Sequence, residues 1–209
     1  TCAVNSRACY RLETRRVDIE KNTDREASMS IVKFFRLLRV RLVTQGLKAT
    51  LYWLFNVFNR LILDQPIRSQ CQITPQLFVG AQFHRRGWRV LHNWGITGVV
   101  NMRSEFNDLG LGVEIPAYLH LSTRDDDAPT LDSLRKGVDF IRSEIEKGGK
   151  VYIHCGAGVG RAPTMAAAYL VSAGMTPQQA WEAIRKERIF IRPTRVQREQ
   201  LERYAAAQG

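Results

Sequence analysis

The stretch that decides the fold reads Lys150-Val-Tyr-Ile-His154-Cys155-Gly-Ala-Gly-Val-Gly-Arg161-Ala162. Its apolar, β-branched beginning predicts a buried strand, and the alanine-rich run after Arg161 predicts a helix. Three glycines separate the two elements and allow a tight loop, in which backbone N–H groups turn inward in front of a helix N-terminus. The sequence therefore predicts an anion-binding loop between a strand and a helix.

Two side chains give this loop a specific chemistry. Cys155 opens the loop, where the helix terminus and a nearby arginine stabilise a thiolate. Arg161 follows six residues later, so its guanidinium can return over the same cavity and bind two phosphate oxygens. This combination suits nucleophilic attack on a phosphate monoester. We therefore predict Cys155 as the nucleophile and Arg161 as the phosphate clamp, and we expect His154 to orient the loop by hydrogen bonding. The predicted phosphate-binding residues are Gly156, Ala157, Gly158, Val159, Gly160 and Arg161.

The ester oxygen that leaves needs a proton, and a separate acidic loop can supply it. Residues 122–129, Ser-Thr-Arg-Asp125-Asp126-Asp127-Ala-Pro, follow a predicted strand. One carboxyl group there can protonate the leaving oxygen and later activate water. We predict Asp125 as this acid, with Asp126 as the second choice. At least one of the three aspartates is expected to be only part of a solvated turn.

Strands and helices alternate on both sides of the loop. Thr176 and Thr194 each precede a glutamine at the third helical position, which indicates capping boxes at two helix starts. Such alternation predicts an α/β layered domain. The predicted strands are 76–80, 96–102, 118–121 and 150–154, and the predicted helices are 89–94, 131–146, 162–173, 177–186 and one beginning after Thr194.

The chain upstream of this domain has two parts with different compositions. Residues 1–28 are polar and lack the apolar core of a secretory signal, so we expect a disordered tail or an upstream extension. Residues 29–69 form a basic, apolar helical segment with a break at Gly46, and residues 70–209 form the catalytic domain. Positions 29–63 hold six basic and no acidic residues. This helical segment either binds an anionic lipid surface or packs on the catalytic domain.

Charge and cysteine content restrict the partners and the compartment. The net charge of +11 suits a phosphorylated substrate, an anionic membrane or nucleic acid. No strand face combines aromatic and basic residues, so we expect no nucleic acid partner. The spacing of the four cysteines fits neither a zinc site nor a compact disulfide framework. A reducing cytoplasmic compartment is expected, because Cys155 must remain a thiolate.

The residues now in view resemble the dual-specificity branch of the protein tyrosine phosphatase superfamily. The pattern His154-Cys-x2-Gly158-x2-Arg161 is similar to its signature, and segments 73–80, 95–101 and 192–197 and the acidic loop extend the resemblance over residues 70–205. The resemblance implies a central four- to five-stranded, mostly parallel sheet flanked by helices. It also implies catalysis through a phosphocysteine intermediate at Cys155, without a metal or another cofactor.

Two subgroups resemble the chain in different segments. Residues 123–125 and 131–141 resemble mitochondrial-type lipid phosphatases, and residues 158–163 resemble the prenylated regenerating-liver phosphatases. Ala162 departs from the Ser or Thr that most of the family has there, which predicts slow hydrolysis of the phosphocysteine. Gly156 stands where many inositide-acting relatives carry Lys, which argues against a highly charged headgroup.

Three functions are therefore in competition. The first is hydrolysis of phosphomonoesters on protein Tyr, with Ser and Thr as further substrates. The second is a phospholipid phosphatase at a membrane surface, acting on phosphatidylglycerophosphate or a phosphoinositide. The third is a phosphoprotein-binding module with slow turnover, which Ala162 favours and the intact Cys155 and Arg161 oppose.

Overall fold

The computed structural model describes residues 31–208, so the predicted tail or extension at residues 1–28 lies outside the described residues. The chain divides into two compact units, Thr1–Gly46 and Leu47–Gly209. Helix α2 (Ile31–Phe58) crosses this division, and its backbone leaves the helical conformation at Gly46, where φ is 79° and ψ is 173°. The predicted break at Gly46 is confirmed. None of the helices within residues 31–208 is long and apolar enough to span a membrane.

A four-stranded parallel sheet forms the centre of the larger unit. Its strands are β1 (Leu77–Ala81), β2 (Gly98–Arg103), β3 (Ala117–Thr123) and β4 (Val151–Cys155), in the spatial order β1-β4-β2-β3. Each neighbouring pair is parallel, and β4 lies between β1 and β2. The predicted α/β fold with a mostly parallel sheet is therefore confirmed. Because all four strands point the same way, their carboxyl ends meet at one edge, where ligands bind in such sheets.

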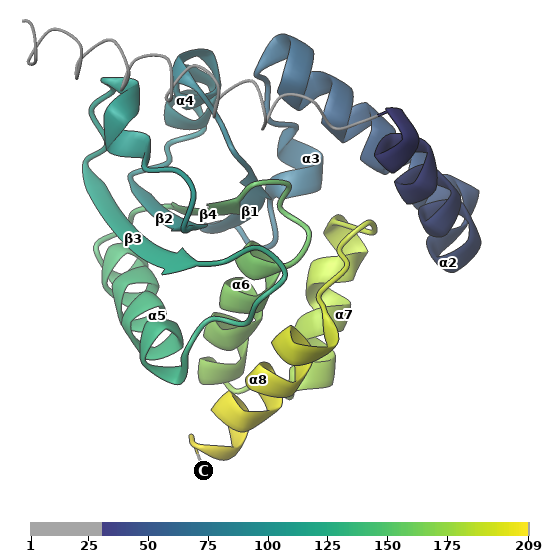
Figure 1. Ribbon diagram of the computed structural model, residues 1–209. Helices are drawn as coiled ribbons and strands as arrows, with labels where there is room; N and C mark the ends of the chain where they lie inside the picture. Colours follow the sequence, from purple (N-terminus) through teal and green to yellow (C-terminus); the bar gives the residue numbers. More distant parts are fainter. Residues whose placement is uncertain (1–30, 209) are drawn as a thin grey trace, which may run out of the picture. The chain divides into compact units, whose positions relative to one another are not determined.

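Helices cover both faces of this sheet (Figure 1). One face packs against α5 (Leu131–Glu146) and α6 (Arg161–Ser172), and α7 (Pro177–Glu187) and α8 (Arg195–Ala206) pack around these two helices. The other face carries α3 (Arg68–Cys71) and α4 (Arg85–Asn93). The 3-10 helix η2 (Asp108–Leu111) precedes β3 in the chain. Each face of the sheet has its own hydrophobic core, and successive side chains along β4 point alternately into one core and the other. Val151, Ile153 and Cys155 lie in the first core, and Tyr152 lies in the second. Cys155 is thus anchored by a strand that is buried on both faces.

The helix starts follow the capping signals, with one exception. Thr176 and Thr194 both form the predicted capping boxes. Helix α4 begins at Arg85, four residues before the predicted start. The Asp64 carboxylate accepts the backbone N–H groups of His84 and Gly87, at 2.8 and 2.7 Å. This cap comes from a distant part of the chain, so no local pattern around residue 85 indicated it.

Residues 47–72 belong to the same compact unit as the sheet. The second half of α2 continues into the π-helix η1 (Asn59–Leu63), and α3 follows after a short turn. Asn56 of α2 donates a side-chain hydrogen bond to the Gln70 side chain at 3.1 Å, which ties the two helices together. Residues 47–69 of the predicted helical segment therefore lie in the same compact unit as the sheet, which agrees with packing on the catalytic domain, one of the two roles expected for this segment.

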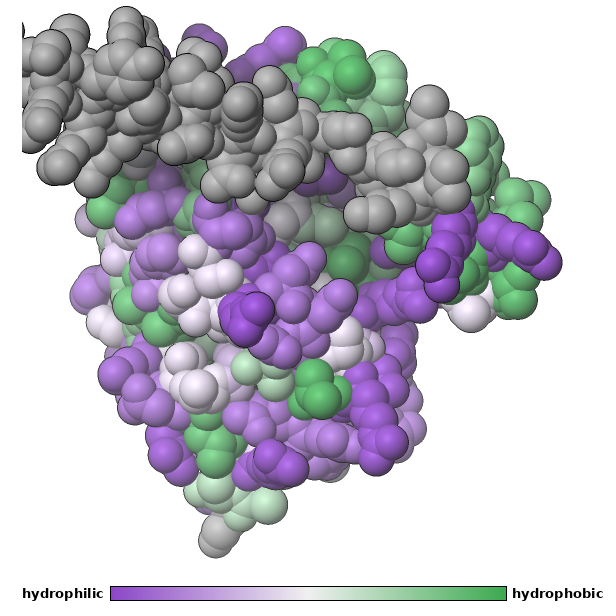
Figure 2. Space-filling view, viewed as in Figure 1, coloured by the Kyte–Doolittle hydropathy of each residue, from purple (hydrophilic) through white to green (hydrophobic). Residues whose placement is uncertain are grey.

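The outer side of this helix is apolar. Figure 2 shows hydrophobic residues gathered over the end of α2 and η1, at the top of the view. The exposed large apolar residues are Leu47, Leu51, Tyr52, Phe55, Phe58, Leu61 and Ile62. Five of them, at positions 47, 51, 55, 58 and 62, follow the spacing of one helix face. We call these seven residues the apolar stripe.

Candidate active site

The glycine loop joins the end of β4 to the start of α6, as the sequence predicted. Cys155 is the last residue of β4, and its Sγ is 3.3 Å from the Gly158 N–H, which donates a hydrogen bond to it. Gly158 has a φ of +66°, and a Cβ there would come within 2.3 Å of the Gly80 carbonyl oxygen. Only glycine fits this position, because a side chain would meet both backbone strain and the neighbouring strand.

The carbonyl groups of the loop are bonded on its outer side. The Gly156 carbonyl accepts from Gln82 N and the Val159 carbonyl accepts from Arg192 N, at 3.2 and 2.7 Å. The fully buried Arg188 donates through Nε to the Gly158 carbonyl at 2.8 Å. Because a peptide group directs its N–H away from its C=O, carbonyls fixed outward leave N–H groups for the concave side. The loop can therefore hold an anion next to Cys155.

Arg161, the first residue of α6, lies over this concavity with only 1% of its side chain exposed. Its Nη1 donates to the Thr123 carbonyl and to Glu105 Oε2, at 2.8 and 2.9 Å, and its Nη2 donates to Glu105 Oε1 at 2.9 Å. Nη2 also lies 2.9 Å from Asp125 Oδ1. The buried Nε has no hydrogen-bond partner among the described residues. The guanidinium is thus held along one edge, while Nε remains available to a ligand.

Glu105, which sequence reasoning missed, fixes this guanidinium. It lies just beyond β2 and also accepts a hydrogen bond from Arg103 at 2.8 Å. Partial burial raises the pKa of Glu105, but hydrogen bonds from Arg161 and Arg103 outweigh this and lower the pKa to about 2. Burial by itself lowers the pKa of Arg161. The hydrogen bond to Glu105 and the negative charges of Cys155, Asp125 and Glu105 outweigh burial, so the pKa of Arg161 is raised above its usual value. The sequence did contain one indication of this role. Glu105 follows β2, a parallel strand next to β4, and residues at the carboxyl ends of neighbouring parallel strands lie close together.

His154 contacts a second residue that the sequence did not indicate. Its Nε2 lies 2.7 Å from Asp108 Oδ2, and neither side chain is exposed. Burial raises the pKa of Asp108, but the hydrogen bond and the charge of His154, together with hydrogen bonds from Gln82 and Tyr118, lower it. The pair anchors the end of β4 to η2. The hydrogen bond of His154 thus goes to Asp108 of η2 and not to the glycine loop, and its orienting role stays a prediction.

The acidic loop approaches the glycine loop through Asp125. The Asp125 carboxylate contacts Arg161, although 79% of its side chain is exposed. Asp126 adopts a left-handed backbone conformation with a φ of 63°, and its carbonyl accepts a hydrogen bond from the Thr194 hydroxyl at 3.0 Å. The Asp127 carbonyl accepts from Gln197 Nε2 at 2.9 Å. The start of α8 therefore holds the acidic loop next to Arg161.

The remaining predicted position, Ala162, is fully buried in the first turn of α6. Its methyl group offers no hydrogen-bond donor to Cys155. Within residues 31–208, no group of three or more His, Cys, Asp or Glu side chains is arranged to hold a metal ion. The groups assembled around Cys155 are thus a thiol, backbone amides, a guanidinium and carboxylates, which suit phosphoryl transfer to sulfur.

Comparisons with known proteins agree with this chemistry. The family model described as "Polymorphic toxin system, DSP-PTPase phosphatase" matches residues 78–175. The human phosphatidylglycerophosphatase and protein-tyrosine phosphatase 1 is 34% identical over 167 residues, which cover 72% of this chain and 82% of the relative. Human dual specificity protein phosphatase 5 is 29% identical over 143 residues, covering 66% of this chain and 35% of that protein.

Solved structures give the same result. The crystal structure of PTPMT1 in complex with PI(5)P is similar with a TM-score of 0.60 and 31% identity, over 65% of this chain and 94% of that one. The crystal structure of DUSP15 is similar in fold, with a TM-score of 0.59 and 24% identity. The chain belongs to the dual-specificity family of protein tyrosine phosphatases, and it is a cysteine-dependent phosphatase.

Proposed function

We propose that the chain hydrolyses phosphomonoesters through a phosphocysteine at Cys155, with Arg161 as the phosphate clamp and Asp125 as the general acid. The carrying observation is that the Gly158 N–H donates to Cys155 Sγ, while the buried Nε of Arg161, at the other end of the same loop, has no hydrogen-bond partner among the described residues. The Cys155 thiolate attacks phosphorus, and the ester P–O bond breaks as Asp125 gives its proton to the leaving oxygen. Water then attacks phosphorus and passes a proton to Asp125, and the P–S bond breaks to release phosphate and the thiolate.

The hydrogen bonds of Arg161 couple phosphate binding to delivery of the acid. Of its five N–H groups, three donate to Glu105 and Thr123, one faces Asp125, and the Nε–H is free of described partners. A phosphate that binds the Nε and Nη2 edge in bidentate fashion takes the place of Asp125 on Nη2. The Asp125 carboxyl group, released from Arg161, then lies beside the ester oxygen that needs its proton. The side chain of Asp126 makes no comparable contact with Arg161, which supports Asp125 as the acid.

For the substrate, we propose phosphotyrosine in proteins first, with phosphoserine and phosphothreonine as further substrates. A phospholipid is the second candidate, because one relative carries phosphatidylglycerophosphatase in its name and a similar structure holds PI(5)P. The apolar stripe supports that candidate, since it could lie in the interface of a membrane. We place the enzyme in a reducing, cytoplasmic setting, with residues 29–63 in peripheral contact with anionic lipid and residues 70–209 as the catalytic domain.

Parallel measurement of kcat/KM on a phosphotyrosine peptide, phosphatidylglycerophosphate and a phosphoinositide tests the substrate assignment. Cys155→Ser is the control for each, and it should abolish turnover of all three. Phosphotyrosine hydrolysis at least tenfold above both lipids supports the first candidate, and the reverse order supports the second. If Cys155→Ser retains activity, the phosphocysteine mechanism is wrong.

Vesicle co-sedimentation tests the membrane contact separately. Vesicles with anionic phospholipid should bind the full chain more tightly than neutral vesicles, and replacing Phe55 and Phe58 by Ser should weaken this binding. The control Lys48→Gln removes a neighbouring exposed charge and should act only at low salt. Equal binding of the wild type and the Phe55→Ser/Phe58→Ser variant would contradict the interfacial role of the stripe.

A further inference from the structure

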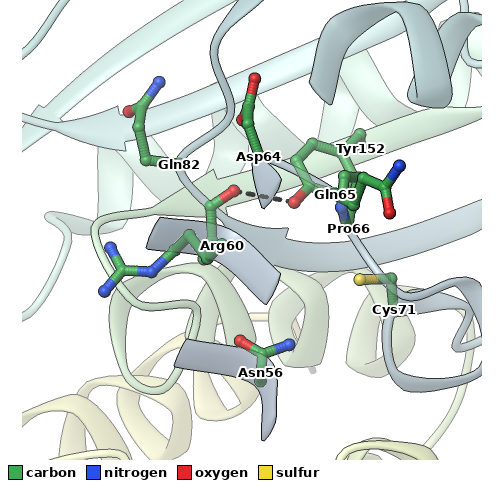
Figure 3. A pocket seen from close by; sticks show the side chains of 9 residues that line it. Asn56, Arg60, Asp64, Gln65, Pro66, Cys71, Gln82 and Tyr152 are labelled. Carbon is green, nitrogen blue, oxygen red and sulfur yellow. Dashed lines mark hydrogen bonds between the residues drawn. The ribbon is translucent and has the colours of Figure 1, made fainter. Parts of the chain in front are cut away.

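The back of the glycine loop contacts a residue from far upstream in the chain. Arg60, in the π-helix η1, donates through Nη1 to the Gly156 carbonyl at 3.0 Å, across 96 positions of sequence. The same carbonyl accepts Gln82 N on the end of β1. Figure 3 shows Arg60 lining a small cavity together with Asn56 and Asp64 of the same segment, and with Gln82 and Tyr152. The helix η1, which lies outside the Cys155–Arg161 loop in sequence, therefore supports the carbonyl of the first residue after Cys155.

The charge of Arg60 acts on Cys155 as well. Burial lowers the pKa of Arg60, while the negative charge of the Cys155 thiolate raises it. The positive charge of Arg60 and the negative charge of the Cys155 thiolate therefore attract each other. Arg161 ends the loop and begins α6, whereas Arg60 contacts the loop at the Gly156 carbonyl.

The position of Arg60 is fixed by its neighbours. Asp64, one turn later, binds the N-terminus of α4 through His84 N and Gly87 N. Asn56, one turn earlier, is bonded to Gln70. The Gln70 carbonyl accepts from Arg188, the residue that holds the Gly158 carbonyl. The two arginines thus support both halves of the loop, and the segment that carries Arg60 is tied to the support of the other.

We propose that Arg60 is a positioning residue of the phosphatase: it holds the Gly156 carbonyl outward, so that the loop amides face the phosphate, and it stabilises the Cys155 thiolate. The expected effect of Arg60 on kcat/KM rests on the proposed function. The expected effect of Arg60 on the Cys155 thiolate does not depend on turnover, because the rate at which an alkylating agent reacts with Cys155 reports the thiolate directly.

The experiment compares Arg60→Ala, Arg60→Lys and the control Lys48→Ala in the full chain. Lys48 is an exposed cation on α2, the helix that continues into η1, and it makes none of the loop contacts described above. The readouts are kcat and KM with p-nitrophenyl phosphate, the rate of Cys155 alkylation by iodoacetamide from pH 5 to 8, and the unfolding temperature. Arg60→Ala should lower kcat/KM about tenfold, as expected for loss of one charged hydrogen bond, and slow alkylation at pH 6 several-fold. Arg60→Lys should recover the alkylation profile, because it keeps the charge, and part of kcat/KM.

Lys48→Ala should change neither kinetic readout. The proposal is overturned if Arg60→Ala is folded and leaves both kcat/KM and the alkylation rate unchanged. It is also overturned if Arg60→Ala lowers both kcat/KM and the unfolding temperature but leaves the alkylation profile unchanged, because the loss of activity would then reflect a less stable protein. If Arg60→Ala does not fold, Arg60→Lys decides: wild-type kcat/KM would refute the role of the guanidinium. If the wild type shows no phosphatase activity, the proposed function fails, and the alkylation series still tests Arg60.

Discussion

Replacing Glu105 by Gln should destabilise the protein at neutral pH, and the loss should shrink as the pH falls. The pKa of Glu105 is about 2 in the folded chain against 4.5 for a free glutamate. At about 1.4 kcal/mol per unit, this difference corresponds to at most about 3 kcal/mol in the free energy of unfolding. The side chain is 28% exposed, so solvent screening reduces the expected contribution to about 1–2 kcal/mol. Because the folded pKa is depressed, the stabilisation is complete above the unfolded pKa and is lost as the pH falls toward 2.

Urea unfolding at pH 7, 5.5, 4 and 3 measures this effect for the wild type, Glu105→Gln and a control. The control Glu146→Gln removes an exposed glutamate of α5, and its free energy of unfolding should lie within about 0.5 kcal/mol of the wild type at each pH. The gap between the wild type and Glu105→Gln should fall by about half between pH 7 and pH 3. A gap that stays constant over this range, or no gap at pH 7, would refute the reasoning that Glu105 acts as a charged partner of Arg161.

Three further predictions test the site. Ala162→Ser should speed phosphocysteine hydrolysis about tenfold, because the new hydroxyl group can donate a hydrogen bond to the departing thiolate. Burst and steady-state kinetics measure this effect, and an unchanged burst and turnover would contradict it. Asp125→Asn should lower kcat/KM about 10²–10³-fold and remove the fall of kcat/KM at high pH, because a general acid must be protonated to act in the step that forms the phosphocysteine. Asp126→Asn should do neither, and the opposite result assigns the acid to Asp126. Asp108→Ala should cost about 3 kcal/mol of unfolding free energy in urea, since it leaves the buried His154 unpaired, and a loss below about 1 kcal/mol would show that the pair contributes little.

The parts of the fold that depend on local signals could be predicted from the sequence. The capping boxes at Thr176 and Thr194 fixed two helix starts, and helix α5 has the predicted bounds. The glycine loop was predictable for the same reason, because its strand, its glycines and its helix are consecutive in the chain. The start of α4 was not predictable, since its N-terminal cap is Asp64, a residue in a different segment.

The supports of the site could not be found in this way. Arg60, Glu105 and Arg188 reach the loop from three separate elements, and the pairing of each with the loop depends on tertiary packing. Glu105 alone had a usable signal, because it follows a strand whose carboxyl end must lie near that of β4. An arginine near the end of α7 and another in η1 look like surface charges in the sequence, although Arg188 is fully buried.

The contrast between the loop and Ala162 determines how substrates must be compared. Contacts from outside fix the carbonyls of Gly156 and Gly158, so phosphate binding and attack by Cys155 meet a loop that is already in place. Release of the thiolate has less support, since the residue after Arg161 is Ala162. If phosphocysteine hydrolysis is the slow step, every substrate passes through the same phosphoenzyme and gives the same kcat. Only kcat/KM, or the rate of the burst, then retains the preference between a phosphopeptide and a phospholipid, because both depend on the steps up to formation of the phosphocysteine.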